Sequence, residues 1–198
     1  MDAYLASLPA GLESYPQCRI KGAAFAPLTK SPPPGLEPSV LPQVLRDVLE
    51  RPPSVTDWVP EVWFASIVHH LRDAVFESDA AYEAWNLEGM RNTLGGPLYR
   101  MRFAFLSPRR MAKMAPRSWS SFRQGSHRTL LEEHADHNIG QLGYPEHFVD
   151  EFYMQFHGRS IEYIYSLSRA KNPRFSLIEW TPTKSVFRVD YDIGKTGS

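Results

Sequence analysis

The sequence has one cysteine, Cys18, among 198 residues, and it has no net charge and no long apolar run. A single cysteine excludes an internal disulfide and any zinc site built on several thiolates. No stretch approaches the about 20 apolar residues of a membrane-spanning helix, and the first residues lack the basic and apolar regions of a signal peptide. Because 22 basic and 22 acidic residues cancel, nucleic acid and anionic membranes are not expected partners. These features predict a cytoplasmic protein.

Motifs that mark common catalytic sites are also missing. The sequence has no Gly-x-Ser-x-Gly elbow, no phosphate-binding glycine loop, no His-Glu-x-x-His pair and no arrangement that would activate Cys18. Glu151 is followed three residues later by Met154 rather than by a histidine, which does not fit a di-metal carboxylate helix. We therefore expect no cofactor and no enzymatic activity, and an enzyme of unknown class remains a third alternative.

Prolines and glycines punctuate the first half of the chain. Residues 1–35 are predicted to form an arm on the body, with a short strand at Arg19–Lys21 and a helical turn at 23–28. The apolar residues of this arm need cover, and they are Tyr4, Leu5, Leu8, Tyr15, Ile20 and Phe25. Residues 36–96 read as a helical subdomain whose first helix spans 40–49, and Gly95-Gly96-Pro97 marks the next boundary.

Two further helices are expected in that subdomain. One follows Pro60, with Thr56 or Asp57 as its cap, and the next spans Asp79–Leu94. The apolar face of the first contains Phe64, Ile67, Val68, Leu71 and Val75. His69 and Asp73 lie on the opposite side, where a solvated surface is predicted rather than a catalytic pair.

Residues 97–198 are predicted to form an α+β subdomain. A helix over 98–105 is followed by a second one that begins at Ser107-Pro108, with Ser107 as N-cap and a kink at Pro116. Alternating patterns predict one hairpin from 126–133 and 138–144 and another from 174–181 and 185–191. Between them, residues 145–170 are apolar over most of a helical wheel, as in a helix buried against several neighbours.

The fold class is therefore α+β: N-terminal helices plus a ββ-α-ββ unit with an antiparallel sheet packed on a long central helix. The three segments are expected to fold together. Core positions are predicted at Leu130, Leu142, Phe152, Phe156, Leu177, Phe187 and Val189.

The space beneath the central helix is the predicted place for a ligand, because aromatic side chains from helix and sheet converge there. His157 or Tyr163 would supply the polar contact to an apolar or aromatic molecule. The candidate binding residues are Trp119, Phe122, Phe152, Phe156, His157, Tyr163, Phe175 and Leu177. The alternative is that these rings simply fill a close-packed interior.

Two polar clusters each allow a functional and a plainer interpretation. His134, Asp136 and His137 share a predicted hairpin turn, where a metal site is the alternative to an ordinary polar turn. Basic residues surround Trp119 and Phe122, where a phosphate-binding surface is the alternative to a basic helix edge, and they are Arg109, Arg110, Lys113, Arg117, Arg123 and Arg128.

Short motifs spread over nearly the whole chain resemble a myxobacterial paralogous family of uncharacterised proteins of about this length, known as a domain of unknown function. They are Ser14-Tyr15-Pro16-x-Cys18, Pro52-Pro53 with Trp58-Val59-Pro60-Glu61-Val62, Gly96-Pro97-Leu98-Tyr99-Arg100, Ser107-Pro108 with Trp119-x-x-Phe122, and Trp180. The half from about residue 97 is distantly similar to the superfamily of vinyl-reductase-type and haem–nitric-oxide-binding domains. That resemblance implies helices on an antiparallel sheet around a small-molecule pocket.

The same resemblance does not extend to a haem or metal. The haem-binding Tyr-x-Ser-x-Arg motif is missing, since Tyr165-Ser166-Leu167-Ser168-Arg169 has its serines at other offsets, and the cysteine and histidine cluster is absent. The sequence thus favours a small-molecule-sensing or regulatory binding module. The alternative is a scaffold or dimerising protein that acts through protein–protein interaction without a ligand.

Overall fold

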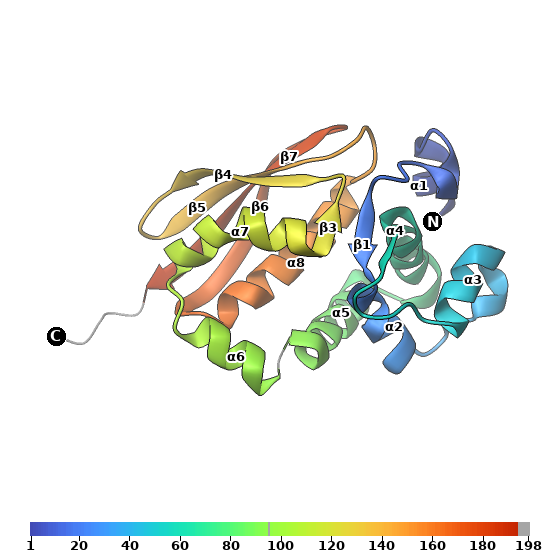
Figure 1. Ribbon diagram of the computed structural model, residues 1–198, viewed down its shortest axis with the longest axis horizontal. Helices are drawn as coiled ribbons and strands as arrows, with labels where there is room; N and C mark the ends of the chain where they lie inside the picture. The colour runs from blue at the N-terminus through green and yellow to red at the C-terminus, as the bar shows by residue number, and fades with distance from the viewer. Residues whose placement is uncertain (95, 194–198) are drawn as a thin grey trace. The chain divides into compact units, whose positions relative to one another are not determined.

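The computed structural model describes residues 1–94 and 96–193, which form two compact units (Figure 1). The first unit holds Met1–Thr93 together with Phe122–Gly125, and the second holds Leu94–Ser121 and the chain from Ser126. The predicted arm and most of the predicted helical subdomain thus share one unit. The boundary lies beside the predicted Gly95-Gly96-Pro97 break, of which Gly95 is outside the described residues.

The first unit surrounds a small antiparallel sheet with helices. Its elements are α1 (Asp2–Ser7), η1 (Gly11–Glu13), β1 (Arg19–Lys21), η2 (Gly22–Phe25), α2 (Ala26–Lys30), η3 (Pro38–Val40), α3 (Gln43–Glu50), β2 (Trp58–Pro60), α4 (Glu61–His70), the π-helical turn η4 (Leu71–Val75), α5 (Asp79–Leu94) and β3 (Arg123–Gln124). The predictions of β1, of a helical turn after it and of α5 are confirmed.

The prediction of a helix cap at Thr56 or Asp57 is wrong, because residues 58–60 form a strand. Strand β1 lies between β2 and β3, so that Arg19 pairs with both Pro60 and Gln124. The Asp57 carboxylate accepts a hydrogen bond from the Ser54 amide at 2.8 Å, and α4 starts only at Glu61. The pairing partners of β1 are distant in sequence, which a local helix signal does not reveal.

The prediction that His69 faces solvent is also wrong. Its side chain is only 4% exposed, and its ring stacks on Tyr4 with centroids 4.4 Å apart. The predicted face of α4, including Phe64, Ile67 and Val68, is buried as expected. The N-terminal segment covers a further side of this helix, since α1, η1 and β1 all contact α4. Asp73 is exposed and forms an ion pair with the amino group of Met1.

The second unit contains the four-stranded antiparallel sheet. Its elements are α6 (Pro97–Ala104), α7 (Pro108–Phe122), β4 (His127–Glu133), β5 (His137–Gly143), α8 (Glu151–Ser166), β6 (Ala170–Thr181) and β7 (Lys184–Ile193). The strand order is β4-β5-β7-β6, and α8 packs against β6 (Figure 1). Both predicted hairpins are therefore confirmed. Ser107 Oγ accepts from the Arg110 amide at 3.3 Å, as the predicted N-cap of α7 requires.

The central helix is shorter than predicted at both ends, because it spans Glu151–Ser166 rather than 145–170 and β6 already begins at Ala170. Asp150 caps it, since its Oδ1 atom accepts from the Tyr153 amide at 2.7 Å. Phe148 and Val149 are buried in the preceding loop, and the Val149 carbonyl accepts from the Trp180 indole at 3.0 Å. The apolar pattern that predicts the longer helix therefore includes Phe148 and Val149, which belong to this loop.

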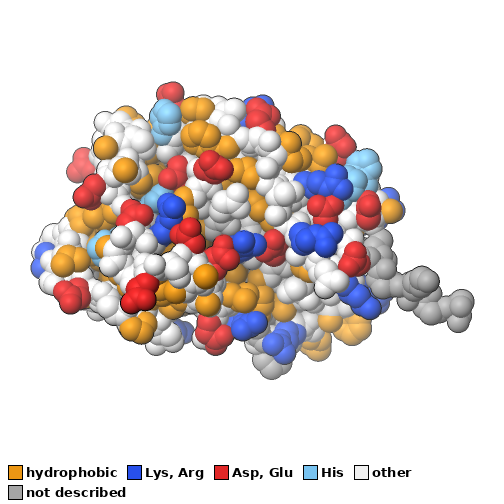
Figure 2. Space-filling view, turned by 180° about the vertical axis from the view of Figure 1, so that it is seen from behind, with side chains coloured by type: hydrophobic (Ala, Val, Ile, Leu, Met, Phe, Trp, Pro, Cys, Tyr) orange, Lys and Arg blue, Asp and Glu red, His pale blue; other side chains and the backbone are white. Residues whose placement is uncertain are grey.

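The predicted core is partly confirmed. Leu142, Phe187 and Val189 are buried, whereas the remaining predicted positions are half-buried, namely Leu130, Phe152, Phe156 and Leu177. Among the described residues, no helix has the length and apolar character needed to cross a membrane. The face drawn in Figure 2 carries hydrophobic side chains between charged ones of both signs.

Cys18 generates a testable expectation about the first unit. Its thiol is fully buried, and burial together with the charge of Glu61 raises its pKa to about 12. In the unfolded chain the thiol ionises near its ordinary pKa, so its contribution to stability is complete below about pH 9 and is lost as pH rises towards 12. We expect Cys18→Ala to reduce the fall in unfolding free energy between pH 9 and 12, measured by urea denaturation. Identical pH slopes in the two proteins would contradict this.

Candidate functional site

The four-stranded sheet has one face towards α8 and one face away from it. Side chains alternate along each strand, and directly paired residues share a face. Leu130, Gly140, Phe187 and Leu177 form one row across the sheet. Arg128, Asn138 and Phe175 occupy neighbouring rows on the same face, and both Phe175 and Asn138 contact α8. This inner face is where the predicted ligand-binding residues would have to meet.

His157 on α8 lies at the centre of an aromatic cluster, and its side chain is buried. Trp119 of α7 approaches it edge-on with ring centroids 5.3 Å apart, and Tyr153 and Phe156 of α8 lie at 4.4 and 5.8 Å. The Trp119 indole also donates to Ser126 Oγ at 3.0 Å. The structure therefore brings three predicted residues together, Trp119, Phe156 and His157, and adds Tyr153, which the prediction omitted.

Phe175 and Leu177 stand on β6 beside this helix. The Phe175 ring lies on Phe187 with centroids 5.4 Å apart, and Leu177 pairs directly with Phe187. Gly158 of α8 is so close to Phe175 that a Cβ atom there would meet the ring at 2.3 Å. The glycine thus permits the helix to approach the Phe175 ring of β6.

The other predicted residues stand in different environments. Phe122 is 45% exposed and belongs to the first compact unit, and Phe152 is half-buried. Tyr163 is buried, and its hydroxyl has no hydrogen-bond partner among the described residues. A buried hydroxyl without a partner is energetically costly, which makes Tyr163 the predicted residue with the most evident need of a polar contact.

The inner face also carries a polar group that the predicted ligand site does not include, formed by Arg128, Asn138 and Tyr165. Asn138 Nδ2 donates to the Tyr165 hydroxyl at 3.1 Å, and the Arg128 guanidinium lies over the Phe187 ring at 5.1 Å. Burial lowers the pKa of Arg128, and burial raises the pKa of Tyr165 against the opposing charge of Arg128. Strand alternation offered the signal, because it aligns Arg128 with the inward-facing Leu130.

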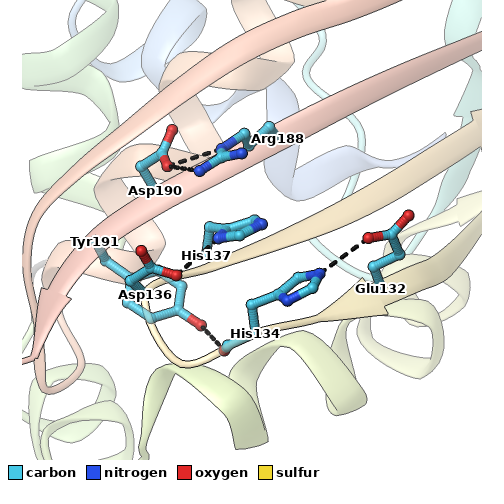
Figure 3. A network of polar contacts seen from close by, with 7 residues as sticks. All are labelled: Glu132, His134, Asp136, His137, Arg188, Asp190 and Tyr191. Carbon is cyan, nitrogen blue, oxygen red and sulfur yellow. Dashed lines mark hydrogen bonds and ion pairs between the residues drawn. The ribbon is translucent and has the colours of Figure 1, made fainter.

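The predicted histidine turn lies at the end of the β4–β5 hairpin (Figure 3). The His134 and His137 rings are stacked 4.2 Å apart, with an angle of 13° between their planes. Each ring has its own carboxylate, since His134 Nε2 is 2.9 Å from Glu132 and His137 Nδ1 is 2.8 Å from Asp136. The hydrogen bond from His137 lowers the pKa of Asp136.

This arrangement does not resemble a metal site. Within residues 1–94 and 96–193, no group of three or more His, Cys, Asp or Glu side chains could hold a metal ion. Parallel stacked rings direct their nitrogen lone pairs side by side rather than towards a common point, so His134, Asp136 and His137 do not form a ligand set. On the same end of the sheet, Arg188 binds Asp190 at 2.7 Å, and Tyr191 donates to the His134 carbonyl at 3.4 Å (Figure 3).

No family model, no curated protein and no solved structure matches this chain. The resemblances in the sequence therefore stay predictions.

The contact between Gly158 and Phe175 can be tested by a double substitution. Gly158→Ala should destabilise the protein by about 1–3 kcal/mol, because the new methyl group overlaps the Phe175 ring. In a Phe175→Ala background the same change should instead stabilise it by up to about 1 kcal/mol, the usual advantage of alanine within a helix. Urea unfolding of the four proteins measures both effects, and the same sign in both backgrounds would contradict the contact.

The Asp136–His137 pair predicts a local effect of pH. Because the Asp136 pKa is held low in the folded protein, the stabilisation is present above its ordinary pKa and is lost as pH falls through the folded value. His137→Leu should raise the Asp136 pKa towards its usual range in an NMR titration. His134→Leu is the matched control, since His134 pairs with Glu132 instead. Equal Asp136 pKa values in all three proteins would disprove the assignment.

Proposed function

We propose that the second unit is a small-molecule-binding module with a sensing or regulatory role, whose ligand is held at the layer between α8 and the inner face of the sheet. The observation that carries the proposal is the buried imidazole of His157 among the rings of Trp119, Tyr153 and Phe156. Ligand sites in proteins commonly combine aromatic walls with a few buried polar groups.

The chemistry of this layer favours an apolar or aromatic ligand. Rings from α7, α8 and β6 would pack against its body, while the buried Tyr163 hydroxyl is available to donate or accept one hydrogen bond. Neither a cofactor nor catalysis is needed for this role, and we propose none. The enzyme alternative would require titratable groups that converge on a reacting atom.

Protein–protein interaction is the second candidate, and an exposed face of α6 favours it. Met101 and Phe105 are 61% and 73% exposed and lie one helical turn apart, so they share a side of the helix. From Gly89 to Leu131 the chain has no acidic residue but nine basic ones: Arg91, Arg100, Arg102, Arg109, Arg110, Lys113, Arg117, Arg123 and Arg128. Two copies of α6 would bring like charges together, so this face suits an acidic partner protein better than a homodimer.

Native mass spectrometry of the protein as purified separates these candidates. A retained small molecule supports the ligand-binding proposal, and a dimer abolished by Phe105→Glu would favour a homodimer instead. For the ligand site we use Phe156→Ala, which should cost about 3–5 kcal/mol if Phe156 only fills a packed core. At a ligand site the loss should be smaller, and the retained mass should disappear.

Phe64→Ala is the matched control, because Phe64 is a buried ring of the first unit. It should lower stability and leave the retained mass in place. A core-sized loss in Phe156→Ala, with no molecule retained by the unaltered protein, would contradict the ligand-binding proposal.

A further inference from the structure

Arg128 stands on the inner face of the sheet, in an unusual place for a charged side chain. It pairs with the buried Leu142 across β4 and β5, one row away from Gly140 and Phe187. Its guanidinium carbon nevertheless lies 5.1 Å from the centroid of the Phe187 ring. The side chain therefore reaches across the sheet to the row of Gly140 and Phe187 rather than outwards from its own row.

Within the part of the chain that the structure describes, no carboxylate forms an ion pair with Arg128. Other basic residues of the second unit do have such partners: Arg109 and Lys113 bind Glu133, Arg159 binds Glu162, and Arg188 binds Asp190. For Arg128, neither an ion pair nor a hydrogen bond is made with a described residue, and its contact is the Phe187 ring. Arg128 is half-buried, and a guanidinium in this position without a carboxylate partner would be stabilised by an anion.

Tyr165 supplies a second donor beside this charge. Its hydroxyl oxygen accepts from Asn138 Nδ2 at 3.1 Å, which leaves the phenolic proton for another acceptor. No described residue accepts that proton. Burial raises the Tyr165 pKa, so the phenol stays protonated at neutral pH. Its partner Asn138 lies on the same face of the sheet as Phe187 and one row away from it, which places the phenol on the side of the sheet where Arg128 contacts Phe187.

We propose that Arg128 and Tyr165 bind the carboxylate of a small organic acid whose apolar or aromatic body lies along the inner face of the sheet. Guanidinium groups bind carboxylates through two parallel hydrogen bonds, and the Tyr165 hydroxyl adds a third donor. Phe187 and Phe175, whose rings are stacked, provide an apolar surface beside the charge. This inference rests on the proposed ligand-binding function and narrows the ligand to a monocarboxylate.

The test compares three probes by isothermal titration calorimetry at neutral pH: phenylacetate, its neutral analogue phenylacetamide, and acetate. Phenylacetate should bind the unaltered protein at least about ten-fold more tightly than phenylacetamide, because hydrogen bonds to a charged group exceed those to a neutral one. It should also bind more tightly than acetate, which lacks the aromatic body. Arg128→Met should remove the preference for the acid, Arg128→Lys should retain part of it, and Tyr165→Phe should weaken it severalfold.

Arg188→Met is the matched control, since Arg188 lies on the other face of the sheet and pairs with Asp190. It should leave the preference for phenylacetate unchanged. Arg128→Met should fold, because the half-buried Arg128 forms no ion pair with a described residue and its replacement leaves no carboxylate unpaired. Arg128→Lys and Tyr165→Phe keep the test decisive if it does not.

The outcomes separate this inference from the function on which it rests. Equal binding of phenylacetate and phenylacetamide would overturn the carboxylate site and leave a neutral ligand for the module. Equal binding of acetate and phenylacetate would reduce Arg128 to a site for a bare anion and overturn the inference. A retained molecule that lacks an acidic group, or that survives Arg128→Met, would do the same. If no probe binds and native mass spectrometry finds no retained molecule, both proposals fail.

Discussion

The close approach of α8 to β6 at Gly158 is the constraint on which the second unit depends. A side chain there would overlap the Phe175 ring, so glycine permits this ring to lie against the helix. Phe175 in turn stacks on Phe187, and Tyr165, about two turns further along the same face of the helix, meets Asn138. Helix position, aromatic stacking and the buried polar contact therefore follow from one small residue.

Charged side chains have different partners on the two faces of the sheet. On the outer side, His134, His137 and Arg188 each have a carboxylate nearby and retain access to water, so their net contribution to stability is small. On the inner side, Arg128 is half-buried with no carboxylate partner among the described residues, and Tyr165 is buried with one hydrogen bond to its hydroxyl. The outer charges already have partners of opposite sign, whereas an added anion would stabilise the inner side most, at Arg128.

The balance of charge over the whole chain conceals its segregation along the sequence. Basic and acidic residues cancel in number, yet the segment 89–131 has only basic ones. Carboxylates from outside the segment form ion pairs with some of these basic residues. Glu133 pairs with Arg109 and Lys113, and the buried Glu61 pairs with Arg123 at 2.9 Å. The basic residues of α6 favour an acidic partner protein in our proposal. The guanidinium of Arg128 on the inner face favours an acidic ligand.

Local patterns in the sequence determined the α+β class, helix α5, the Ser107 cap and the two hairpins, because helical periodicity, capping and strand alternation act between near neighbours. They also singled out Trp119, Phe156 and His157, since aromatic residues on apolar faces tend to meet in a core. Only the tertiary structure decided the pairing of β1 with β2 and β3, the burial of His69 and the start of α8 at Glu151. Each of these depends on partners far away in the chain. The same holds for Arg128, because the residues that surround its charge, Phe187, Asn138 and Tyr165, come from other elements of the second unit.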